Sequence, residues 1–290
     1  MALQDQLVVG LTLGATYALI AIGFSLVFRS VGLLNFTHPE FMMMGAMVGL
    51  TVTSRYNLSP IFAILASGLA SGLLALLVER TAIAPIMKRQ GQRINQIIAS
   101  LGWATVLTNA AMLIWGPQPM AYRHTFGGTV WKIGSVPVAA QHVFILSSSL
   151  VLMVALQLFF KYTRLGLAMR ATADDSTMAL LTGIETRHIV SATFFLSGSL
   201  AGMAGVLIGS LFYASFDLGQ YGLRALSAAV IGGFGDPVGA VLGGFVLGVV
   251  ETLSGTYVSS AYRDAMAFAI AILVLLVRPY GLVGRRRRTV

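Results

Sequence analysis

The sequence predicts an all-α, polytopic integral membrane protein in one domain (residues 1–290), with about eight transmembrane helices, some of them broken or re-entrant. Three observations support this fold class. Of the 290 residues, 57% are hydrophobic and only 10% are charged, whereas soluble domains carry roughly 25% charged residues. The mean hydropathy is +0.83, and a soluble protein of this composition would expose large apolar patches. The apolar residues also gather in runs of membrane-spanning length.

A bilayer core of ~30 Å is crossed by about 20 helical residues. The candidate spans in chain order are residues 7–28, 41–53, 60–78, 94–115, 143–160, 189–212, 223–234, 238–252 and 261–277. The glycine-rich pair 223–234 and 238–252 is either two short spans or a re-entrant hairpin. The first run is interpreted as a span and not a signal peptide, because Asp5 and no basic residue precedes it.

Basic residues predict the orientation of these spans. With the N-terminus outside, the inner segments hold fourteen lysines and arginines and the outer segments hold four. This bias favours an outer N-terminus and an inner C-terminus. The basic tail 285–290 then lies inside. The loop 116–142 lies outside, either as a docking or capping surface or as a plain connector.

A polar cluster interrupts the apolar sequence in the stretch LNFTHPEFMMMGA at residues 34–46. Pro39 cannot continue a helix and pushes His38 away from helical geometry, so the second span should be broken near its inner side. A helix that starts within the membrane directs its positive dipole end inward. Asn35, His38 and Glu40 then either line a gate or cap and brace the break. One histidine and one glutamate at this spacing do not make a metal site.

Two further ionisable residues fall within apolar spans. Glu251 and Arg224 are candidates for a transport pathway, since intramembrane charges are costly and are usually functional. The alternative is that they pair with each other or with a helix end. An enzyme is not expected, because the chain has no cysteine and Ser197 lies in LSGS, which lacks the G-x-S-x-G elbow.

The long inner segment 161–188 contains a predicted helix at residues 172–183. Thr172 is the expected N-cap, with Asp175 three residues later as a capping box, and Gly183 fits the C-terminal cap. Such a short capped helix suggests a docking element for a soluble partner.

One face of this helix carries Met178 and Leu181, with Asp174 one turn earlier. The alternative to docking is an amphipathic helix resting on the bilayer. Asp174 and Asp175 disfavour contact with an anionic membrane surface, so docking is preferred.

The segment TMALLTG at 177–183 matches, through Ala179 and Gly183, the A-x-x-x-G core of the loop by which ABC importer permeases contact their ATPases. Its surroundings, and the stretches YALIAIGFSLVF, NFTHPEFMMMGA and AAVIGGFGDPVGAVLGGFVLGVVE, resemble the branched-chain amino acid permeases of the LivH type. The resemblance covers about residues 7 to 283. The chain departs from that family's usual pattern at Pro39 and at Asp236-Pro237.

The resemblance implies an ABC importer permease fold in a bacterial inner membrane. It implies three kinds of partner: a second homologous permease, two ATP-binding subunits that carry ATP and Mg²⁺, and a periplasmic solute-binding protein. The chain has no G-x-x-x-x-G-K-[ST] motif of its own and is expected to bind no cofactor. The implied solute is a branched-chain amino acid or a related small polar or carboxylate solute. An ATP-independent transporter or channel is the alternative.

Overall fold

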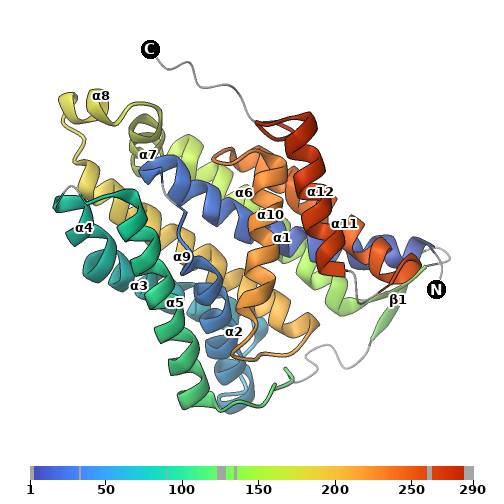
Figure 1. The fold of residues 1–290 in the computed structure, drawn as a ribbon. Coiled ribbons are helices and arrows are strands. Elements are labelled where there is room, and N and C mark those ends of the chain that lie inside the picture. The colour runs from blue at the N-terminus through green and yellow to red at the C-terminus, as the bar shows by residue number, and fades with distance from the viewer. Residues whose placement is uncertain are drawn as a thin grey trace.

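The computed structural model describes residues 3–32, 34–89, 91–122, 129–133, 136–259 and 263–283. Helices dominate this part of the chain (Figure 1), which confirms the predicted all-α class. A small sheet was not predicted: β1 (Val130–Ile133) pairs antiparallel with β2 (Val136–Ala139) within the predicted loop 116–142. The predicted tail 285–290 lies outside the described residues.

Six helices among the described residues are long and apolar enough to cross a membrane. They are α1 (Leu3–Val31), α3 with its continuation (Pro60–Lys88), α5 (Arg93–Trp115), α6 (Ala140–Tyr162), α9 (Thr186–Leu211) and α11 (Pro237–Tyr257). Three more pack among them but are shorter or less apolar: α2 (His38–Arg55), α10 (Gly219–Gly232) and α12 (Arg263–Val277). The expected number of about eight spans is therefore not confirmed.

The continuation of α3 contains a wide turn. Helix α3 itself is Pro60–Val78, followed by the π-helical turn η1 (Glu79–Ile83) and then by α4 (Ala84–Lys88). Pro85 has no N–H and its ring crowds the preceding turn, so a widened turn just before it relieves that conflict.

Helix α1 lies at the centre of the bundle and packs most extensively against α11. Small residues allow this close approach. A Cβ on Gly14 would lie 2.8 Å from Cα of Phe245, and the Cα of Gly244 abuts Ala18 from the other side. Close backbone approach supplies the van der Waals contact that replaces the hydrophobic driving force in lipid.

Two helices begin in the interior of the bundle. His38, the first residue of α2, is fully buried and lies against Gly23 of α1, eight residues before the end of α1. Eight residues correspond to about 12 Å of helix, so α2 starts about that far inside the end of α1. Glu40 contacts Gly219, the first residue of α10, so α10 starts at the same depth.

The predicted break before α2 is thus confirmed, but its position differs in detail. The prediction that Pro39 pushes His38 out of helical geometry is wrong: His38 is the first residue of α2 and Pro39 the second, so the helix begins earlier than expected. Proline is tolerated there because a helix's first N–H groups have no intrahelical partner. The structure also shows how the glycine-rich region 223–252 is arranged. Helix α10 is short and starts in the interior of the bundle, whereas α11 is long and apolar enough to cross a membrane.

A backbone bridge ties two loops together at the end of the bundle where α5 and α9 finish. Met120 N–H donates to Ala214 O at 2.8 Å, and Ala214 N–H donates to Met120 O at 2.9 Å. Ala214 begins the segment that leads into α10. The loop after α5 and the entry to α10 are therefore joined.

The segment between α6 and α9 forms two helices, α7 (Arg164–Asp174) and α8 (Ser176–Leu181). The prediction that Thr172 is an N-cap is wrong: Thr172 lies near the end of α7, where its hydroxyl donates to Ala168 O. The helix starts earlier because Thr163 caps it by accepting from Gly166 N–H at 2.9 Å. Figure 1 shows α7 and α8 at one end of the bundle, with the N-terminus and β1 at the other.

Candidate functional site

The start of α2 is braced by a buried hydrogen-bond network. Asn35 Oδ1 accepts from Thr37 N–H at 3.0 Å. His38 Nε2 lies 3.1 Å from Ile20 O, and His38 Nδ1 lies 3.1 Å from Ser197 Oγ. A carbonyl only accepts, so Nε2 carries the proton in the tautomer assigned from this network. His38 therefore links α2 to α1 and α9 and fits the predicted role of a brace.

The residues just before α2 are also hydrogen-bonded to Ser100 of α5. Thr37 Oγ1 donates to Ser100 O at 2.7 Å, and Phe36 N–H donates to Ser100 Oγ at 3.2 Å. Ser100 is fully buried although α5 is otherwise mostly exposed. A displacement of α5 would therefore be transmitted to the start of α2.

Glu40 lies where the starts of α2 and α10 meet. Its Oε1 would be 2.5 Å from a Cβ on Gly219, so a larger residue there would push the Glu40 carboxyl group aside. The Thr108 side chain of α5 interacts with the same carboxyl group. Pro39 packs in the same way against Gly222, one turn along α10.

This placement has an electrostatic consequence. Each helix N-terminus carries a partial positive charge, and Glu40 lies in the first turn of α2 beside the first turn of α10. Two positive helix ends thus face one carboxylate in the interior. The predicted residues Pro39 and Glu40 are brought together with α10, a contact that spacing along the chain did not indicate.

Arg224 and Glu251 form an ion pair in the interior. Arg224 Nη1 lies 2.9 Å from Glu251 Oε1, with side-chain exposures of 15% and 1%. The guanidinium also lies over the ring of Tyr221, 4.6 Å from the ring centroid. The pairing alternative is therefore what the structure contains, and Arg224 keeps a partly exposed edge.

The α7–α8 segment presents an apolar tip. Met178 is 62% exposed and Leu181 is 76% exposed, whereas Ala179 is buried against the segment. Asp175 caps α8 by accepting from the N–H groups of Thr177 and Met178. Ala179 is thus a packing residue, and Met178, Leu180 and Leu181 form the exposed apolar surface, which we call the α8 tip.

Two other predicted residues fix this segment. Gly183 ends α8 with φ +85°, a left-handed conformation that favours glycine, and Ile184 N–H donates to Ala179 O at 3.0 Å. Asp174 Oδ1 accepts from Arg29 Nη2 at 2.8 Å, which ties the end of α7 to the end of α1. The α8 tip is therefore held on a rigid, capped support.

One polar face was missed by the sequence reasoning. Asn95, Gly102, Thr105 and Asn109 of α5 are exposed, and their spacing of seven, three and four places them on one helix face. Thr105 Oγ1 donates to Leu101 O at 3.1 Å and Asn109 Nδ2 donates to Thr105 O at 2.8 Å, so these donors are satisfied within α5. The amide oxygens of the two asparagine side chains make this face suited to contact protein or water. Polar residues at helical spacing within the span 94–115 were the signal that could have indicated it. We call these four residues the α5 polar face.

A metal centre has no support in the described part of the chain. Those residues contain no group of three or more histidine, aspartate or glutamate side chains placed to hold an ion.

Comparison with known proteins gives one consistent answer. The family model "Branched-chain amino acid transport system / permease component" matches residues 6–275. The branched-chain amino acid permease LivH of Salmonella typhimurium is 36% identical, over 97% of this chain and 95% of the relative. BraD of Pseudomonas aeruginosa is 35% identical with the same coverage. The solved structure of PsaBC from Streptococcus pneumoniae in complex with Fab shares the fold: it is 12% identical, with a TM-score of 0.50 over 99% of this chain and 93% of that one.

Proposed function

Because this chain belongs to the family of permease components of branched-chain amino acid transport systems, we propose that it forms half of the membrane pathway of an ATP-driven importer. The solute is a branched-chain amino acid or a related small carboxylate. The observation that carries the mechanism is the capped α8 tip with its three exposed apolar side chains.

The complete transporter contains four further parts. Two ATP-binding subunits hold ATP and Mg²⁺, a second homologous permease completes the pathway, and a periplasmic binding protein delivers the solute. The α8 tip inserts into an apolar cleft of one ATPase. The bias of basic residues supports a cytoplasmic position for α7 and α8 and an outer N-terminus.

The pathway runs between the two permeases and along the α5 polar face. Movement of the ATPase is transmitted from the α8 tip to α1 through the Arg29–Asp174 ion pair. Helix α1 contacts the start of α2 through His38, and the start of α2 is bonded to α5 through Ser100. This chain of contacts couples the cytoplasmic end to the helix that faces the pathway.

The first experiment identifies partners. The chain is purified from its native membrane in a mild detergent, and the co-purifying subunits are identified by mass spectrometry. We expect ATPase subunits and a second permease, and we expect the ATPases to be lost in a Met178→Glu/Leu181→Glu variant. The matched control is Leu113→Glu, which changes an exposed residue at the opposite end of the bundle.

Two outcomes would overturn parts of this proposal. A homo-oligomer without ATPase that transports solute when reconstituted alone would establish the channel or secondary-transporter alternative. ATPases retained by the α8-tip variant would place the docking surface elsewhere. Titration of the partner binding protein with leucine, isoleucine, valine and other small carboxylates then identifies the solute.

A further inference from the structure

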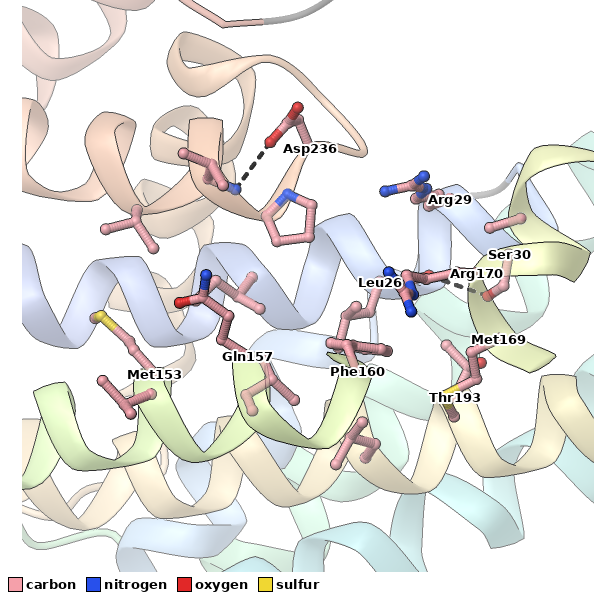
Figure 2. A pocket seen from close by; sticks show the side chains of 18 of the residues that line it. Leu26, Arg29, Ser30, Met153, Gln157, Phe160, Met169, Arg170, Thr193 and Asp236 are labelled. Atoms are coloured by element: carbon pink, nitrogen blue, oxygen red, sulfur yellow. Dashed lines mark hydrogen bonds between the residues drawn. The ribbon is translucent and has the colours of Figure 1, made fainter. Parts of the chain in front are cut away.

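A groove at the α7 end of the bundle is not used by the proposed transport mechanism. Its cavity volume is about 580 Å³, and it lies between α1, α6, α7, α9 and α11. Its walls are mainly apolar, with Leu26 from α1, Met153 and Val154 from α6, and Val241 from α11. Figure 2 shows these helices with the side chains converging on the groove.

The charged side chains of the groove lie at one end of it. Arg29, Arg170 and Asp236 lie at the helix ends, respectively in the last turn of α1, on α7 and at the N-cap of α11 (Figure 2). The apolar wall residues lie deeper along the same helices. Arg29 already donates to Asp174 at 2.8 Å, which leaves its other N–H groups for a second acceptor.

The flanks of the groove are suited to lipid. Leu150, Val154 and Leu158 of α6 and Val238 and Leu242 of α11 are strongly exposed and carry no polar atom in their side chains. This differs from the α5 polar face on the same chain. A groove with charged groups at the helix ends and apolar walls toward the membrane centre has the polarity profile of one phospholipid.

The charges at the rim indicate the head group. Guanidinium groups bind phosphate oxygens through charge-assisted hydrogen bonds. Asp236 uses Oδ1 to accept from the N–H groups of Val238 and Gly239, and a carboxylate at this rim would repel a purely anionic head group. A head group that carries both a phosphate and a primary ammonium matches two arginines and one aspartate together.

We propose that this groove binds a phospholipid of the phosphatidylethanolamine type, with its phosphate on Arg170 and Arg29, its ammonium on Asp236 and an acyl chain along α6 and α11. Because Arg170 belongs to α7 and Arg29 holds Asp174, the lipid joins the α7–α8 segment to the transmembrane helices. Choline lipids lack an N–H donor for Asp236, and phosphatidylglycerol lacks the positive charge.

The test uses the complex that contains this chain, in nanodiscs of defined composition, with retained lipid counted by native mass spectrometry. We expect retention in the order phosphatidylethanolamine, then phosphatidylcholine and phosphatidylglycerol. Asp236→Asn keeps the N-cap, since asparagine caps as well as aspartate, and should remove only the preference for ethanolamine over choline. Arg170→Gln should weaken retention of the phospholipid about fivefold, as expected for one basic contact. Arg164→Gln, on the same helix but not lining the groove, is the control.

A second measurement tests what covers the groove. The chain has no cysteine, so Val154→Cys can be labelled with a single fluorophore in the assembled complex. We expect quenching by doxyl-labelled phosphatidylethanolamine to exceed quenching by the same label on phosphatidylcholine. A label that lipid quenchers do not reach means that a protein subunit covers the groove, and this would overturn the proposal. So would equal retention of all three lipids, or equal effects of Arg170→Gln and Arg164→Gln.

Discussion

Removal of Glu251 tests whether the buried ion pair with Arg224 stabilises the middle of the bundle as a unit. The two charges lie 2.9 Å apart, and Glu251 is 1% exposed. Deleting one partner of such a pair leaves a charge in the interior without its counter-charge and costs about 3–5 kcal/mol. At roughly 2–4 °C per kcal/mol, Glu251→Leu should lower the apparent Tm by about 6–20 °C.

The double variant separates the ion pair from simple loss of packing. Arg224→Leu/Glu251→Leu removes both charges, so it should be more stable than either single variant. The assay is the fraction of folded protein after heating in detergent, measured by size-exclusion chromatography for the wild type, both single variants and the double variant. Glu185→Gln disrupts an exposed contact with His188 and should leave the Tm unchanged. Costs that simply add in the double variant would refute the reasoning.

Three other substitutions test separate contacts. Gly205→Val should abolish accumulation of folded protein, because a Cβ at this position overlaps the Met42 carbonyl. The control Gly102→Ala has open space around it and should fold normally. The yield of protein extracted in detergent measures both effects. Gly183→Val should leave the yield of folded protein intact but reduce ATP-coupled uptake, since φ +85° costs a branched residue about 1–2 kcal/mol. Solute uptake into vesicles measures this effect, and uptake at the wild-type rate would contradict the prediction. Ser197→Ala should lower the free energy of unfolding by about 1–3 kcal/mol, because it leaves His38 Nδ1 and the Gly23 carbonyl without this hydroxyl; an unchanged Tm would argue against that network.

Sequence reasoning predicted the positions of the spans because hydropathy and length decide whether a helix can enter lipid. It could not predict which helices lie in the core. The 18-residue apolar windows of α1 and α6 are similarly hydrophobic, with mean hydropathies of 2.0 and 2.3. Yet 78% of the window in α1 is buried, against only 22% of the window in α6. Apolar side chains satisfy lipid and protein neighbours equally, so hydropathy does not separate the two.

Local signals were reliable where one residue determines the backbone. Pro39 marks the start of α2, and Gly183 ends α8 with a positive φ. The capping prediction failed at Thr172 because Asp175 is the stronger cap and Thr163 had already started a helix upstream. The contact of Glu40 with Gly219 joins residues far apart in the chain, and no local pattern predicts it.

The bridge between Met120 and Ala214 connects the loop after α5 directly to the segment that enters α10. Two short hydrogen bonds form this bridge, and only a few residues separate Ala214 from Gly219. A force applied to the loop after α5 therefore reaches the point where Gly219 meets Glu40 without passing along a whole helix. The interior junction of α2 and α10 is thus connected to the loop after α5 through α10, and to the α8 end of the bundle through α1.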